Sequence, residues 1–146
     1  MINLLVNCKT WNDGQLKVLI IDDCEAIGKK VKEIISENPL VYVLGQAMNV
    51  GEALKMFKEL NPDAVFLDIN LPDGNGLDTL EHLKKLKPGL KVITFSNAAN
   101  DIYRRRFTQM GSDYFLDKSK DFTKIPEIIN QIISSLNNPS LFRMII

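Results

Sequence analysis

Acidic, hydroxyl and amino side chains stand at the ends of short apolar runs in this sequence. Asp22 and Asp23 end the first of these runs, Asp68 and Ser96 end two others, and Lys118 directly follows a fourth. Carboxylates that lie close together raise one another's pKa unless a cation joins them, and an all-oxygen ligand set favours a hard ion such as Mg²⁺. With a lysine and a hydroxyl group added, the set predicts a site for a phosphoryl group in which a carboxylate is the nucleophile.

The elements that must position these residues begin at Lys17. From there, short apolar runs alternate with helical patterns in five cycles, which is typical of βαβ units in a parallel sheet. Strands are expected at residues 17–22, 41–48, 64–68, 91–96 and 114–117. The expected helices carry apolar positions at Ile27, Val31, Ile34 and Ile35; at Val50, Ala53, Leu54, Phe57 and Leu60; over Leu77 to Leu86; at Ile102, Tyr103, Phe107 and Met110; and at Ile125, Ile128, Ile129, Ile132, Ile133 and Leu136.

Local signals set several helix ends. Asn49 followed by Glu52 predicts a capping box at the second helix, and Gly111 predicts the end of the fourth. Thr123 is the expected N-cap of the fifth helix, with Pro126 in its first turn, where a missing amide hydrogen is harmless.

The predicted fold is α/β, a doubly wound five-stranded parallel sheet with strand order 2-1-3-4-5. In such sheets, ligands bind at the carboxyl ends of the strands, where the strand order reverses. This order makes strands one and three neighbours and brings all five polar residues into one crevice. Each residue alone could instead cap a helix, start a turn or end a strand in solvent. Their joint occurrence at four of the five strand ends favours a site.

Composition limits the classes of function. The chain has 146 residues, enough for one domain, and the expected organisation is an extension over residues 1–16, a domain over 17–137 and a short apolar tail over 138–146, with no room for a second folded output module. The 18 basic and 18 acidic residues cancel, which argues against binding nucleic acid or a membrane surface through bulk charge. The run Arg104 to Arg106 is interpreted as a solvated helix face.

Cys8 and Cys24 are expected to be free thiols, and the absence of a signal peptide or a long apolar span predicts a cytoplasmic protein.

Four segments carry a resemblance to a known family: KVLIIDD (17–23), VFLDINLPDGNGLD (65–78), VITFSN (92–97) and GSDYFLDKS (111–119). In this order and spacing they resemble the response-regulator receiver domain of two-component signalling, which has the flavodoxin-like (βα)5 fold of CheY. The resemblance covers about residues 17–136, and its most specific part is the block that begins at Asp68, with Pro72 and Gly76 at the family's offsets.

The resemblance implies roles for the acidic residues. Asp68 would be the phosphoacceptor, Asp22 and Asp23 would hold Mg²⁺ directly or through water, and the backbone carbonyl of Asn70 would complete the coordination.

It also implies a switch. Ser96 would hydrogen-bond the phosphoryl group, Lys118 would be the family's lysine, and Phe115 would be the aromatic residue whose rotamer reports phosphorylation, although core packing alone also explains Phe115. The family usually has a proline with a cis bond after the lysine, whereas this chain has Ser119. A cis bond before serine costs about 2.5 to 4 kcal/mol, so the loop beside Lys118 is expected to differ.

The expected function is that of a phosphorylation switch, not an enzyme. It would take a phosphoryl group from a sensor histidine kinase or a histidine phosphotransfer protein, and would either relay it or dock a target protein on the face formed by helix four, strand five and helix five. Direct binding of nucleic acid and contact with a membrane are not expected. The enzyme alternative is a haloacid-dehalogenase-like Mg²⁺-dependent phosphatase, which would need an acid where Asn70 stands. The third alternative is an interaction module with a degenerate site.

Overall fold

Five parallel strands form the sheet at the centre of the computed structural model, which describes residues 14–97 and 100–137. They are β1 (Leu16–Ile21), β2 (Val41–Ala47), β3 (Ala64–Asp68), β6 (Lys91–Ser96) and β7 (Tyr114–Asp117), in the order β2-β1-β3-β6-β7. Counted along the chain as first to fifth, this is the predicted order 2-1-3-4-5. The first strand lies one residue earlier than expected, and the second ends one residue earlier.

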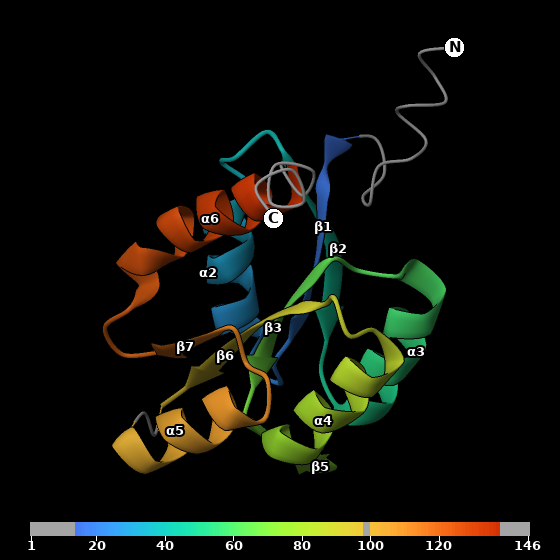
Figure 1. Cartoon of the computed structure of the whole chain (residues 1–146), viewed down its shortest axis with the longest axis vertical. Helices are drawn as coiled ribbons and strands as arrows, with labels where there is room; N and C mark the ends of the chain where they lie inside the picture. The colour runs from blue at the N-terminus through green and yellow to red at the C-terminus, as the bar shows by residue number, and fades with distance from the viewer. Residues whose placement is uncertain (1–13, 98–99, 138–146) are drawn as a thin grey trace, which may run out of the picture.

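Helices cover both faces of the sheet (Figure 1). Helices α2 (Glu25–Ile35) and α6 (Ile125–Asn137) lie on one face, and α3 (Val50–Leu60), α4 (Gly76–Leu86) and α5 (Asp101–Gln109) lie on the other. Successive residues of a strand point to opposite faces, so Val18 and Ile20 of β1 pack in the cluster beneath α2 and α6, whereas Leu19 and Ile21 pack beneath α3 and α4. Because both faces are covered, β1 is apolar throughout rather than alternating.

The predicted capping box of α3 is confirmed. The side chain of Asn49 accepts a hydrogen bond from the backbone N–H of Glu52 at 2.8 Å, and the carboxylate of Glu52 reaches back to the N–H of Met48 at 2.8 Å. The expected N-cap of the fifth helix is wrong. Thr123 lies inside a 3₁₀ turn, η2 (Phe122–Lys124), that leads directly into α6, and Pro126 stands in the first turn of α6 as expected.

The apolar side predicted for the fourth helix is only partly correct. In α5, Phe107 is buried, but Ile102 and Tyr103 are 68% and 40% exposed, and Met110, the C-cap, is 36% exposed. Helix α5 packs against β7, a strand of only four residues at the edge of the sheet. The other apolar side chains of α5 face solvent.

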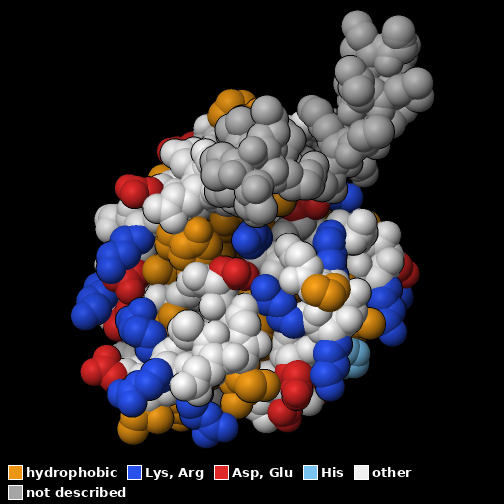
Figure 2. Space-filling model, in the orientation of Figure 1, with side chains coloured by type: hydrophobic (Ala, Val, Ile, Leu, Met, Phe, Trp, Pro, Cys, Tyr) orange, Lys and Arg blue, Asp and Glu red, His pale blue; other side chains and the backbone are white. Residues whose placement is uncertain are grey.

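Charged side chains of both signs are spread over the surface. Figure 2 shows Lys and Arg side chains distributed over the visible face with Asp and Glu among them. Cys24 is a free, exposed thiol, as expected, whereas Cys8 and the tail over 138–146 lie outside the described residues. Within residues 14–97 and 100–137, no helix is long and apolar enough to span a membrane.

A two-stranded hairpin follows β3 and carries an additional cap for α3. It consists of β4 (Asn70–Leu71) and β5 (Gly74–Asn75), and Asp73 lies in its turn. The carboxylate of Asp73 accepts hydrogen bonds from the backbone N–H groups of Val50 at 2.7 Å and of Gly51 at 3.1 Å. The bond from Val50 is the main reason why the pKa of Asp73 lies below its usual value. These bonds tie the loop after Asp68 to the N-terminus of a neighbouring helix.

Replacing Asp73 by asparagine should therefore destabilise the protein in a pH-dependent way. A carboxyl group whose pKa is lowered by folding stabilises the folded state above its unfolded pKa, near 3.8, and loses that contribution as the pH falls through the folded value. The difference in melting temperature between wild type and Asp73→Asn should be largest at neutral pH and shrink toward pH 3. Glu59→Gln, on the exposed surface of α3, is the control and should show a smaller difference. A deficit in Asp73→Asn that stays constant with pH would contradict the charged cap.

Candidate functional site

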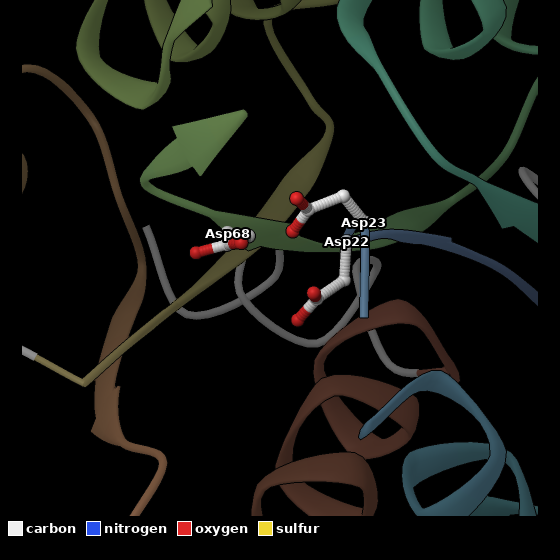
Figure 3. A group of neighbouring side chains, drawn as sticks. All are labelled: Asp22, Asp23 and Asp68. Atoms are coloured by element: carbon white, nitrogen blue, oxygen red, sulfur yellow. The ribbon is translucent and has the colours of Figure 1, made fainter. Parts of the chain in front are cut away.

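Three carboxylates converge at the carboxyl ends of β1 and β3. Asp22 and Asp23 directly follow β1, Asp68 is the last residue of β3, and the two strands are neighbours in the sheet. Each of the three offers an oxygen, and these oxygens all lie within 4.8 Å of one another. Figure 3 shows the three side chains grouped in this space. Asp22 and Asp68 are buried, whereas Asp23 is exposed.

Lys118 brings its ammonium group to two of these carboxylates. Its Nζ lies 2.7 Å from Asp22 Oδ2 and 3.4 Å from Asp68 Oδ2, and the Lys118 side chain is only 5% exposed. Burial alone would lower the pKa of Lys118, but the two carboxylates outweigh it, and the pKa lies above its usual value. Lys118 therefore remains a cation at neutral pH.

Asp68 is under opposite electrostatic influences. Burial and, next, the charge of Asp22 raise its pKa above the usual value, although the nearby charge of Lys118 and a hydrogen bond from the backbone N–H of Asn70, 3.2 Å long, act in the other direction. A further cation in the cluster would stabilise the ionised form of Asp68.

The donor set fits a hard divalent cation. Asp22 Oδ1 accepts a hydrogen bond from the backbone N–H of Cys24 at 2.8 Å. Asp22 Oδ2 is buried, and its partner in the described part of the chain is the Lys118 ammonium at 2.7 Å, which leaves room on this oxygen for a further cation. Such an oxygen, beside the carboxylates of Asp23 and Asp68, is the kind of ligand that Mg²⁺ takes. Asn70, which is exposed, lies two residues beyond Asp68 in the first strand of the hairpin.

A glycine lets this hairpin close against Asp68. The N–H of Gly76 donates to the carbonyl of Ile69 at 2.8 Å, and a Cβ at position 76 would lie 2.5 Å from the Cα of Ile69 and 3.1 Å from the carbonyl oxygen of Asp68. Any side chain at position 76 would therefore displace the backbone beside the acidic cluster.

Ser96 and Phe115 lie where the sequence places them. Ser96 is fully buried at the end of β6, next to β7, and its carbonyl accepts the backbone N–H of Lys118 at 2.8 Å. Phe115 is buried and meets Phe107 of α5 edge to face, with ring centroids 5.7 Å apart. The structure thus links β6, β7 and α5 beside the acidic cluster.

The loop after Lys118 is held by side chains that sequence reasoning did not identify. The carboxylate of Asp117 accepts hydrogen bonds from the N–H of Ser119 at 2.7 Å and from its hydroxyl at 2.5 Å, and these two bonds lower the pKa of Asp117. Asp121 in turn accepts the N–H of Asp117 at 2.8 Å. No peptide bond in the described residues is cis. A proline at position 119 would have neither donor, so Ser119 gives this loop a different support from the one expected for the family.

Arg104 contributes more than the solvated helix face that the sequence predicts. It is exposed, but its guanidinium donates to the backbone carbonyl of Phe115 at 2.9 Å and lies over the Phe115 ring, 5.1 Å from the centroid. The two residues are eleven positions apart in different elements, so no local pattern reveals the contact.

The comparisons with known proteins agree with this architecture. The family model of the response regulator receiver domain matches residues 18–130. Chemotaxis protein CheY of Thermotoga maritima is 31% identical over 116 residues, which cover 80% of this chain and 96% of that protein. The nitrate/nitrite response regulator NarL of Escherichia coli is 31% identical over 122 residues, but these cover only 56% of NarL.

Solved structures of receiver domains superpose on this chain. The response regulator domain of Thermotoga maritima CheB superposes with a TM-score of 0.72 at 28% identity, over 84% of this chain and 97% of that one. A CheY-like receiver domain protein from Methanospirillum hungatei gives a TM-score of 0.74 at 27% identity, over 86% and 98%. The chain belongs to the response regulator receiver domain family, and its function is that of a two-component response regulator. The comparisons give no support to the phosphatase alternative.

Removing the Lys118 ammonium should strongly destabilise the metal-free protein. Lys118→Met leaves Asp22 and Asp68 buried without their cation, and breaking one side of a buried ion pair costs about 3 to 5 kcal/mol. Urea unfolding in a chelating buffer measures the loss. Lys85→Met is the control, because Lys85 is 75% exposed with a single 3.9 Å ion pair, and it should cost less than about 0.5 kcal/mol. Equal losses in the two variants would show that Lys118 does not neutralise the cluster.

Proposed function

We propose that Asp68 accepts a phosphoryl group from a phosphohistidine on a sensor histidine kinase or a histidine phosphotransfer protein. The observation that carries this proposal is the contact of the Lys118 ammonium with both Asp22 and Asp68 inside a cluster of three carboxylates. Asp68 is the member of that cluster that ends the central strand β3, and its Oδ1 is already oriented by the N–H of Asn70.

In the transfer step, an ionised oxygen of Asp68 attacks the phosphorus atom. A P–O bond forms as the P–N bond of the phosphohistidine breaks, and its electron pair returns to the imidazole ring. Asp22, Asp23, Asp68 and the carbonyl of Asn70 would hold Mg²⁺, which supplies positive charge to the carboxylates and the phosphoryl oxygens when it is bound. Lys118 is already 3.4 Å from Asp68, so a small movement away from Asp22 brings its ammonium to a phosphoryl oxygen.

The phosphorylated site would signal through Ser96 and Phe115. The hydroxyl of Ser96 would bind a phosphoryl oxygen and draw the end of β6 toward Asp68, which would change the packing around Phe115 of β7, already buried in this structure. Phe115 is held inward by Phe107 and by Arg104. One added charge would thus bias a packing equilibrium between two states.

The output surface would be the face formed by α5, β7 and α6. Ile102 and Tyr103 of α5 and its C-cap Met110 expose apolar surface there, on the helix whose Phe107 contacts Phe115. Exposed apolar side chains beside an element that moves are suited to a target protein whose affinity depends on phosphorylation. A target protein would therefore bind this face more or less tightly according to the phosphorylation state of Asp68.

Asp68→Asn should abolish phosphorylation while the protein stays folded, because an amide has nearly the shape of a carboxylate but is a poor nucleophile. The test is incubation with a small phosphodonor such as acetyl phosphate and Mg²⁺, read by intact mass. Asp78→Asn, an exposed aspartate on α4, is the matched control and should gain a phosphoryl mass as the wild type does. A phosphoryl mass on Asp68→Asn at the wild-type rate would exclude Asp68 as the acceptor.

Ser96→Ala should separate phosphorylation from signalling. This variant keeps Asp68 and should still gain the phosphoryl mass. Because the hydroxyl of Ser96 is gone, the aromatic NMR signals of Phe115 should stay near their unphosphorylated positions. The same spectra of the wild type should shift on phosphorylation. If Phe115 in Ser96→Ala responds as it does in the wild type, the coupling runs through other groups.

A further inference from the structure

The side chain of Gln46 spans the loop that carries the acidic pair. Its amide nitrogen donates to two backbone carbonyls, that of Asp22 at 2.8 Å and that of Cys24 at 3.1 Å. An amide NH₂ group has two hydrogens, so both are used on this one loop. The first bond fixes the carbonyl of the peptide that joins Asp22 to Asp23, and the orientation of that peptide sets where the Asp23 carboxylate points.

Helix α2 leaves a space for this side chain. Gly28 is buried in α2, and a Cβ at position 28 would lie 1.9 Å from the side-chain oxygen and 2.4 Å from the side-chain nitrogen of Gln46. An alanine would therefore overlap the whole amide group. A glycine lowers the stability of a helix interior, so its presence here needs a packing reason, and Gln46 supplies one.

Strand β2, which carries Gln46, has an irregularity that directs this side chain toward α2. Val41 and Val43 of β2 pack on the side of α2, and Leu44 packs on the opposite side. Regular alternation would put residue 46 on the side of Leu44. Instead the pairing with β1 skips one residue between Val43 and Gly45, and Gly45 has a φ of 148°, a value that favours glycine. This bulge turns Gln46 toward α2 and the acidic loop.

Other bonds hold the same loop from different directions. The N–H of Asp22 donates to the carbonyl of Ala47 at 3.0 Å, and the N–H of Cys24 donates to the Asp22 carboxylate at 2.8 Å. With the two bonds from Gln46, two of the three carbonyls and two of the three amide groups between β1 and α2, those of Asp22 and Cys24, are held. The loop that offers two oxygen ligands is therefore held by bonds within the protein itself.

We propose that Gln46 is a positioning residue for the divalent-cation site, and that it raises the affinity of Asp22 and Asp23 for Mg²⁺ by fixing the peptide between them. Gly28 and the bulge at Gly45 make room for it and aim it. Groups that orient metal ligands without touching the metal commonly change metal affinity by roughly tenfold or more when removed. The inference rests on the proposed binding of Mg²⁺ at this cluster.

The test compares Gln46→Leu with the wild type by two measurements. Leucine has a similar size but no donor, so calorimetric titration with Mg²⁺ should give a dissociation constant about tenfold higher. In metal-free buffer, hydrogen exchange at the amides of Asp22 and Cys24, which donate the loop's N–H bonds, should become faster. Gln131→Leu is the matched control, because Gln131 bonds only to Tyr114 and Glu127 in the described residues, and it should leave both quantities unchanged. A merely structural role would lower the melting temperature without moving the Mg²⁺ affinity.

Gly28→Ala is the second variant, which keeps Gln46 but displaces it. It should weaken Mg²⁺ binding to a similar degree, and Gly28→Ala combined with Gln46→Leu should be no weaker than either alone. Gly89→Ala, where a Cβ meets nothing within 4 Å, is its control. Wild-type affinity in both Gln46→Leu and Gly28→Ala overturns the inference, and if Gln46→Leu fails to fold, Gly28→Ala alone decides. A wild type that binds no Mg²⁺ overturns the proposed function instead, and hydrogen exchange still decides whether Gln46 fixes the loop.

Discussion

The contact between the Lys118 ammonium and the carboxylates of Asp22 and Asp68 constrains the rest of this structure. Two buried carboxylates within a few ångströms of each other are unfavourable, and Lys118 offsets part of that cost without removing it, since the pKa of Asp68 stays above its usual value. The remaining cost is what makes the cluster receptive to a further cation. The parallel sheet order brings β1 and β3 side by side, and β7 is close enough to deliver Lys118 to both.

Polar contacts hold each chain segment that supplies a charged group to this cluster. The loop after β1 is held by Gln46, the loop after β3 closes through Gly76, and the loop after β7 is held by Asp117. These contacts use side chains and backbone groups that do not themselves reach the acidic oxygens. Rigid loops keep the carboxylates close despite their repulsion, which is the form of preorganisation that phosphoryl transfer depends on. The segment from Ser96 to Phe115 joins this rigid site to the exposed apolar residues of α5.

The sequence predicts the sheet and the site well because their signals are local. Strands buried on both faces are short apolar runs, and a polar residue at the end of such a run lies at the carboxyl edge of the sheet, so Asp22, Asp68 and Lys118 could be assigned to one crevice. The contacts that orient these residues carry no such signal. Gln46 acts only because a bulge turns it toward α2, and Arg104 reaches Phe115 across two elements. Thr123 was misassigned because a 3₁₀ turn replaces the expected cap, and α5 exposes residues that its periodicity would bury.

In the proposed function, Lys118 and the acidic cluster together receive a phosphoryl group on Asp68. A crystal structure of the protein with Mg²⁺ and beryllofluoride, a mimic of the phosphoryl group, tests it most directly. We expect the adduct on a carboxylate oxygen of Asp68, with the Lys118 ammonium within hydrogen-bonding distance of a fluoride and no longer 2.7 Å from Asp22. An adduct on another residue, or a Lys118 that stays on Asp22 and does not contact the adduct on Asp68, would contradict it.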